Sequence, residues 1–205
     1  MTQNTYRLNL FLLGCLLLAL LISGCGGARQ PIAYYNLTPL TTEQNRIPAN
    51  QINAPLAIGI GPVQLPDALS RTQIASRLDP ERLKYNEFHR WSGSLTDDFA
   101  NVLLEDIAAQ LPEQATVAIF PWGSYFQPTH RLVINVSRFD GTLGGEVELT
   151  ARWTITGNSG KETLLSRKST IQVKVTGDEY IDLVTAQSRA VADLSTEIAR
   201  ALTGQ

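Results

Sequence analysis

Only a few residues of this 205-residue chain have the types and spacing that catalysis or metal binding requires. Glu87 and His89 form a Glu-x-His pair that could supply two ligands to a metal ion, but the sequence offers no third ligand at a suitable spacing. The second of the two histidines, His130, stands apart from them. Ser94 and Ser124 lack the glycines that surround a nucleophile elbow. We therefore predict no catalytic residue, no metal site and no bound cofactor.

The glycines of Gly59-Ile60-Gly61-Pro62 are half of a dinucleotide-binding fingerprint. The third glycine is missing and no helix is expected to follow, so no phosphate cradle is predicted there. Glycines within a strand more often allow another part of the chain to approach the backbone closely, and we favour that interpretation. No Walker-type phosphate loop is present either, so any nucleotide hydrolysis would belong to another subunit.

Cys25 is the residue whose chemistry the sequence specifies best. Arg7 is the only charged side chain before it, and Leu8 to Leu21 is almost wholly apolar, as in a secretory signal peptide. This run is shorter than the roughly 20 residues that span a bilayer. The triplet Ile22-Ser23-Gly24 before the cysteine resembles the lipobox of bacterial lipoproteins, whose cysteine is lipidated and becomes the first residue. An ordinary signal peptide cut near a cysteine is the alternative.

Lipidation would divide the chain into a signal peptide (1–24), a lipidated tether (25–33) and one domain (34–205). The mature chain of about 180 residues is long enough for one sizeable core. Because Cys15 lies in the signal peptide and Cys25 would carry the lipid, the domain has no disulfide and no thiol nucleophile. The nine tether steps to Tyr34 reach about 30 Å, which would keep the domain close to its membrane.

Charge excludes two classes of partner. Lysine and arginine together number 17 and aspartate and glutamate 19, without a run of like charges. Neither a nucleic-acid surface nor a polybasic membrane patch is therefore expected.

The hydrophobic pattern predicts an α/β (α+β) sandwich: a mixed, largely antiparallel sheet with two main amphipathic helices. Alternation over 146–155 is the clearest strand signal, and Ser94 and Asp178 are the expected caps of the two helices, the first running to Gln110. The segment 141–145 is expected to form the turn between two of the strands, and a binding role there is the alternative. The other predicted strands are 33–37, 56–63, 73–78, 82–88 (paired with 73–78 in a hairpin), 116–120, 132–136 and 171–175.

Two groups of aromatic residues could contact a partner, because aromatic side chains bury much area at low entropic cost. Tyr85, Phe88 and Trp91 precede the first helix, and Trp122, Tyr125 and Phe126 crowd a loop bounded by Pro121 and Pro128. We take Trp91, Trp122, Tyr125 and Phe126 as candidate partner-binding residues. The alternative for both groups is that they close the core beneath the loops.

Three segments together resemble the ABC-type transport auxiliary lipoprotein family, in particular its paraquat-inducible lipoprotein C type, an intermembrane transport lipoprotein. The first is Ile58-Gly59-Ile60-Gly61-Pro62-Val63 with Leu65-Pro66, Arg71, Gln73, Ile74, Glu87-Phe88-His89-Arg90-Trp91 and Leu95. The second is Arg138-Phe139-Asp140-Gly141 with Gly144-Gly145 and Ala151-Arg152-Trp153, and the third is Ala186-Gln187-Ser188-Arg189-Ala190 with Leu194 and Ile198. The likeness extends from about Tyr34 to Leu202.

The resemblance implies a non-catalytic outer-membrane lipoprotein of a system that moves lipid between two membranes. Its partner would be a mammalian-cell-entry (MCE) protein that bridges the periplasm and leads to an inner-membrane permease or ABC complex. Gly26, in place of the aspartate that retains lipoproteins at the inner membrane, implies the periplasmic face of the outer membrane. The resemblance also implies a homo-oligomeric ring and a fold similar to the amino-terminal domain of the Tol-system translocation protein. A periplasmic lipid-binding carrier is the alternative function, and a periplasmic hydrolase is disfavoured because no nucleophile is paired with a base.

Overall fold

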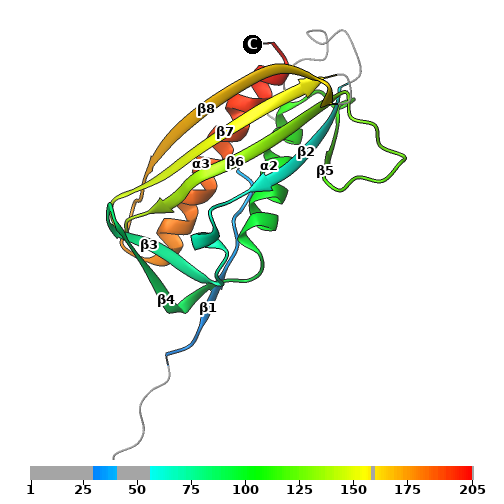
Figure 1. Cartoon of the computed structure of the whole chain (residues 1–205). Coiled ribbons are helices and arrows are strands. Elements are labelled where there is room, and N and C mark those ends of the chain that lie inside the picture. The colour runs from blue at the N-terminus through cyan, green and yellow to red at the C-terminus, as the bar shows by residue number, and fades with distance from the viewer. Residues whose placement is uncertain (1–29, 41–55, 158–159, 205) are drawn as a thin grey trace, which may run out of the picture. The chain divides into compact units, whose positions relative to one another are not determined.

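The computed structural model describes residues 30–40, 56–157 and 160–204, and Ile32–Gln205 form one unit. The predicted signal peptide, Cys25 and most of the predicted tether lie outside the described residues. The predicted fold class is confirmed: two helices pack with mixed sheets in an α+β arrangement (Figure 1). The strands divide into two sheets, whereas the sequence suggested one.

The larger sheet has the strand order β5-β2-β6-β7-β8. Its members are β5 (Thr116–Ile119), β2 (Ala57–Gln64), β6 (His130–Gly141), β7 (Glu146–Gly157) and β8 (Glu162–Lys174). β2 runs parallel to both β5 and β6, whereas β6, β7 and β8 are antiparallel neighbours. The alternation predicted for 146–155 is confirmed, since Val147, Leu149, Ala151, Trp153 and Ile155 are all buried. β8 begins well before the predicted 171–175 because its first half is polar and lies at the edge of the sheet.

The smaller sheet has the order β1-β4-β3, formed by β1 (Ala33–Tyr35), β4 (Arg82–Trp91) and β3 (Gln73–Asp79). β3 and β4 form the predicted antiparallel hairpin, and β1 adds to β4 in parallel. A short 3-10 helix, Asp67–Leu69, leads from β2 to β3.

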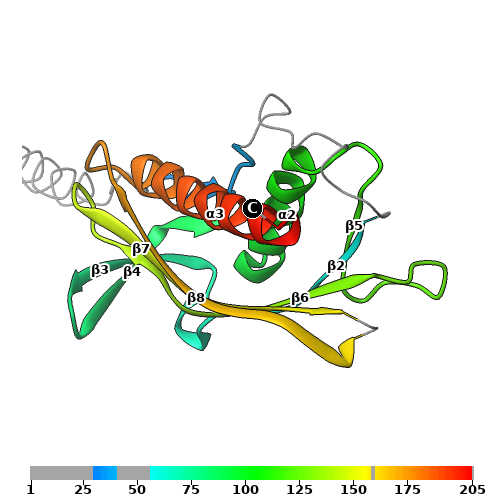
Figure 2. The same ribbon diagram turned by 90° about the horizontal axis from the view of Figure 1, so that it is seen from above.

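Two helices cover one face of the larger sheet, and none of the described residues forms a helix on the opposite face of β6, β7 and β8 (Figure 2). α2 (Leu95–Gln110) begins as predicted, because Ser94 Oγ accepts the backbone N–H of Asp97 at 3.3 Å. The expected cap of α3 (Tyr180–Leu202) is wrong by one residue: Glu179, not Asp178, forms a capping box with Asp182. The Asp182 carboxylate accepts the backbone N–H of Glu179 at 3.1 Å, which fixes the start of the helix.

The core lies between the helices and the covered face of the larger sheet. Phe99 of α2 meets Phe139 of β6 edge to face, with ring centroids 5.2 Å apart. Trp153 is fully buried and donates from Nε1 to Ser169 Oγ at 2.9 Å, so its polar edge is satisfied. Each fully buried side chain of this kind contributes about 1.5–3 kcal/mol relative to its exposed state. The space between sheet and helices is thus filled by the protein's own side chains.

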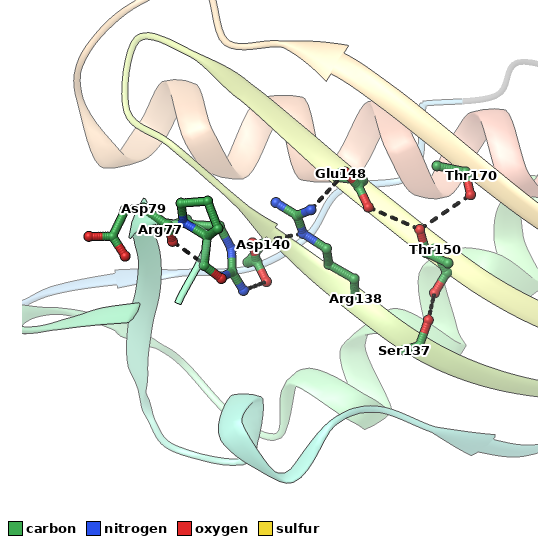
Figure 3. A network of polar contacts seen from close by, with 9 residues as sticks. Arg77, Asp79, Ser137, Arg138, Asp140, Glu148, Thr150 and Thr170 are labelled. Carbon is green, nitrogen blue, oxygen red and sulfur yellow. Dashed lines mark hydrogen bonds and ion pairs between the residues drawn. The ribbon is translucent and has the colours of Figure 1, made fainter. Parts of the chain in front are cut away.

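A network of ion pairs joins the smaller sheet to the larger one (Figure 3). Arg77 of β3 binds both carboxylate oxygens of Asp140 on β6, at 2.5 and 2.7 Å. Arg138 Nε lies 3.3 Å from Asp140, and Arg138 Nη1 bonds Glu148 of β7 at 2.8 Å. Hydrogen bonding to Asp140 is the main cause that raises the pKa of Arg77, so this guanidinium stays charged. The bidentate geometry fixes how the two sheets meet.

The segment that follows β1 is held along both helices by its backbone. Leu37 N–H donates to Asp98 of α2 at 2.6 Å, and Leu40 N–H donates to Asp106 at 2.9 Å. Between them, Thr38 N–H donates to Ser188 of α3 at 3.1 Å. The amino-terminal end of the described domain is therefore fastened to the core rather than hanging from it.

Substituting Asp140→Asn should destabilise the domain by about 3 kcal/mol, because it leaves the Arg77 guanidinium without its buried countercharge. Urea unfolding followed by circular dichroism measures this loss. Asp79→Asn in the exposed β3–β4 turn is the control and should leave the unfolding midpoint nearly unchanged. Equal effects of the two substitutions would contradict the assigned role of Asp140.

Candidate functional site

The loop between β5 and β6, residues 120–129, carries the second aromatic group. Both strands run parallel to β2, and Ile58 pairs with Val117 on one side and with His130 on the other. The chain must therefore return from the end of β5 to the start of β6 outside the sheet. That return places the loop at the end of the sheet where β2 begins (Figure 1).

Gly59 positions Trp122 on the uncovered face of the sheet. Ile58 and Ile60 point into the core and are fully buried, so the position between them faces the other way. A Cβ atom at Gly59 would lie 2.7 Å from the Trp122 ring. The glycine therefore leaves room for the six-membered ring of the indole against the strand, and the close approach favoured from the sequence is confirmed.

Trp122 is the centre of an aromatic cluster with one cation. Its ring meets Phe120 and Phe126 edge to face, with centroids 5.4 and 6.1 Å away. The Arg131 guanidinium carbon lies 5.6 Å from the centre of the indole, in cation–π contact. Arg131 Nε is shielded from solvent and has no hydrogen-bond partner within the described residues. An open hollow with both aromatic and polar walls lies beside the cluster, lined by Trp122, Ser124, Phe126, Gln127, Pro128 and Arg131.

Tyr125 stands apart from this cluster at the tip of the loop. Its side chain is 93% exposed, the largest exposure among the large hydrophobic residues of the described domain. Phe120 at the start of the loop is 54% exposed. The loop thus presents apolar surface to solvent on a base that Trp122 anchors to the sheet.

Thr129 and His130 join the loop to the sheet. The backbone N–H of Thr129 donates to the Ala57 carbonyl at 2.8 Å, and Thr129 Oγ1 accepts the Ala57 N–H at 3.1 Å. His130 Nδ1 lies 3.0 Å from the same hydroxyl. Burial lowers the pKa of His130 below its ordinary value of 6.5, which favours the neutral ring at this junction.

The residues of the first aromatic group do not form a cluster on the surface. For Trp91, the alternative interpretation holds: its side chain closes the core. This residue is 4% exposed and belongs to the core, so our expectation of a surface contact at Trp91 is not met. It ends β4, where its side chain packs inward. Tyr85 donates to the Ala68 carbonyl at 3.0 Å, while Phe88 is 40% exposed on the smaller sheet.

Glu87 and His89 point to separate contacts. His89 Nδ1 lies 2.8 Å from the Tyr35 hydroxyl, and its ring stacks on Tyr180 at 4.2 Å. Glu87 instead accepts from Gln73 and pairs with Arg90. Within residues 30–40, 56–157 and 160–204, no three His, Cys, Asp or Glu side chains are grouped so as to hold a metal ion. His89 serves as a link between β1, β4 and α3.

The aromatic loop and the entry of the chain into the domain lie at opposite ends. β6 starts at His130 beside the loop, and ten residues later Asp140 meets Arg77 of the smaller sheet. That run of strand is about 33 Å long. β1, through which the chain enters, belongs to the smaller sheet and lies at the far end from the loop in Figure 1.

Sequence reasoning missed Gly59 and Arg131 as parts of the site. Both signals were present: Gly59 interrupts the outward positions of an apolar strand, and Arg131 occupies an outward position of β6. Neither signal predicts which residue makes the contact, because the ring that covers Gly59 comes from a loop more than 60 residues away.

The fold and the site define a class: an α+β sandwich domain with helices on one sheet face and an aromatic loop beside the uncovered face. A family model described as the ABC-type transport auxiliary lipoprotein component matches residues 35–199. The chain belongs to the ABC-type transport auxiliary lipoprotein family. Membership makes it a lipoprotein component that is auxiliary to transport, which points away from an enzyme.

Solved structures share the fold. One uncharacterized protein is 22% identical with a TM-score of 0.67, over 83% of this chain and 98% of its own. A Xanthomonas campestris protein assigned to the DUF330 family is 18% identical with a TM-score of 0.66, over 84% of this chain and 97% of its own. A comparison with curated proteins finds no match. None of the helices in the described ranges is long and apolar enough to cross a membrane.

Gly59→Ala should displace the Trp122 ring without unfolding the domain, because the new methyl group would overlap an indole that can move toward solvent. Trp91 and Trp153 are 4% and 0% exposed, so acrylamide quenching of tryptophan fluorescence reports mainly on Trp122. We expect stronger quenching in the variant. Gly93→Ala is the control, since nothing lies within 4 Å of its added Cβ. Unchanged quenching in Gly59→Ala would disprove the proposed anchoring of Trp122.

Acidification should loosen the base of the loop through His130. Because the folded-state pKa lies below 6.5, the His130 contribution to stability is complete above that pH. As the pH falls below 6.5, the unfolded chain binds the proton first and the contribution is lost. We expect the melting temperature and the protection of Trp122 from acrylamide to fall between pH 7.5 and pH 5.

His130→Gln isolates this effect. Asp98 and Asp193 act in the opposite direction, because burial raises their pKa values and favours the folded state as the pH falls. The variant keeps both aspartates, so its difference from the wild type reports on His130 alone. Identical pH profiles for the two proteins would exclude the assigned effect.

Proposed function

We propose that the protein is a non-catalytic outer-membrane lipoprotein of an MCE-type intermembrane lipid transport system. Lipid on Cys25 anchors it to the periplasmic face of that membrane. The domain then docks the periplasm-spanning MCE partner, which leads to the inner-membrane permease or ABC complex. Its mechanism is positional: it holds the outer-membrane end of the transport path.

The observation that carries this proposal is the separation of the aromatic loop from the chain's entry by the length of β6. A tether that enters at the smaller sheet and a short lipidated segment before it favour an orientation with the membrane near that sheet. The loop then faces the periplasm, where a partner arrives. Hydrogen bonds from Leu37, Thr38 and Leu40 to the helices keep the entry fixed, so the orientation of the loop is also constrained.

Tyr125 and Trp122 supply the kind of contact that docking requires. Exposed aromatic side chains on a rigid base are enriched in the parts of interfaces that carry most of the binding energy. Trp122 supplies the rigid base through its contact with Gly59, and Tyr125 supplies the accessible ring. A carrier that enclosed lipid would instead need room between sheet and helices, where Phe99, Phe139 and Trp153 are fully buried.

Tyr125→Ala should weaken binding of the delipidated domain to the periplasmic region of the MCE partner by about 30-fold, the effect of an interface residue worth about 2 kcal/mol. Biolayer interferometry measures the affinity. Phe88→Ala, another exposed aromatic on the smaller sheet, is the matched control and should change it less than twofold. Equal losses for both variants would reject the loop as the docking site.

A genetic test addresses the whole proposal. Deleting the protein should disturb envelope integrity only in strains that retain the MCE partner. An equal defect in strains that lack the partner would contradict the proposed function.

A further inference from the structure

The uncovered face of β6, β7 and β8 carries a cluster of cations next to the aromatic loop. Pairing across the strands places Asn135 opposite Arg152, and Arg152 opposite Lys168. Arg131 lies two pairs further along the same face, opposite Thr156. Val133, which is 38% exposed, lies between Arg131 and Asn135 on β6. We call Arg131, Val133, Arg152 and Lys168 the cationic face.

Within the described part of the chain, no acidic side chain forms an ion pair with the cationic face. The outward positions next to it are serine, threonine or asparagine: Asn135, Thr150, Thr154, Thr156, Thr163, Ser166 and Thr170. In the sequence, no aspartate or glutamate occurs between Glu113 and Asp140, a stretch that includes the whole loop and most of β6. Within the described ranges, the ion pairs between residues include none from Arg131, Arg152 or Lys168. By contrast, Glu148, which lies on the same side of the sheet, is nearer the turn between β6 and β7 and pairs with Arg138.

Arg152 and Lys168 occupy directly opposed positions, where like charges repel across a pair of strands. The cross-strand pair of Arg152 and Lys168 therefore does not stabilise the isolated domain. An anionic surface laid against the cationic face would relieve the repulsion and steer association. A second copy of the same face is disfavoured as the occupant, since it would bring cations against cations.

We propose that the cationic face docks an acidic protein surface and forms, with the aromatic loop, one continuous interface. This inference rests on the proposed function and adds the chemistry of the partner to it: carboxylates for Arg152, Lys168 and Arg131, and an apolar group for Val133 and the hollow beside Trp122. Continuity follows from contacts on the same face. Trp122 lies over Gly59, Gly59 pairs with Arg131, and Arg131 also contacts the indole.

A double charge reversal, Arg152→Glu with Lys168→Glu, tests the proposal. The matched control reverses two exposed cations elsewhere, Lys84→Glu with Arg200→Glu, and gives the same net charge. Association with the periplasmic region of the MCE partner is followed by stopped-flow at several salt concentrations. We expect the face variant to associate at least tenfold more slowly at low salt and to lose most of its salt dependence, while the control stays within about twofold of the wild type.

Fluorescence anisotropy with labelled octaglutamate separates this inference from the proposed function. Binding of octaglutamate by the wild type and control, but not by the face variant, supports the acidic chemistry even if the MCE partner does not bind. If the partner binds the face variant and the control equally well, the cationic face is excluded while the proposed function stands. Suppose instead that the wild type but not the face variant binds phosphatidylglycerol vesicles, and that neither binds octaglutamate. The proposed acidic protein partner is then wrong, because the cationic face binds a membrane.

The melting temperature tests whether Lys168 has a structural role in the isolated domain. Lys168→Gln should raise the melting temperature by about 1–3 °C, because it removes the repulsion from Arg152. A fall in melting temperature would mean that Lys168 stabilises the isolated fold, and would overturn the argument from repulsion. Analytical ultracentrifugation of the wild type and face variant tests the remaining occupant: self-association that the reversal abolishes would replace the acidic partner with a second copy.

Discussion

The arrangement of this domain depends on the burial of only one face of its larger sheet. Two helices cover that face, so each strand from β6 to β8 must alternate between apolar residues that meet the helices and residues that tolerate water. Trp153 and Leu149 meet the first requirement, and Arg152 and Thr154 meet the second. The uncovered face is consequently free for other uses, and its main apolar additions come from the loop that folds over Gly59.

The ion pair between Arg77 and Asp140 extends this arrangement to the smaller sheet. Its bidentate geometry ties β3 to the far end of β6, while the segment after β1 is tied to α2 and α3 through backbone hydrogen bonds. Together these contacts set the entry of the chain and the aromatic loop at opposite ends of one rigid strand. The aromatic loop is therefore held at a defined distance from the point where the chain enters the domain.

Polar groups in the domain serve mainly to join elements. His89 links Tyr35 to Tyr180, and Ser169 accepts from Trp153 while donating to Glu197. Such contacts satisfy buried donors and acceptors without creating a reactive pair. Membership of a transport auxiliary family also points away from an enzyme.

The sequence determined the features that depend on neighbouring residues: strand alternation in 146–155, the Ser94 cap and the turn at 141–145. It placed the α3 cap one residue early, because Asp178 and Glu179 are both capable caps and only the return bond from Asp182 decides between them. It also left both Trp91 and Trp122 as candidate partner-binding residues, since an aromatic residue has the same local pattern in a core and at a surface. The tertiary structure separated them by burying Trp91 beside α2 and laying Trp122 over Gly59. It alone brought Arg131, Arg152 and Lys168 together, because cross-strand register is set by the packing of whole strands and not by any short segment.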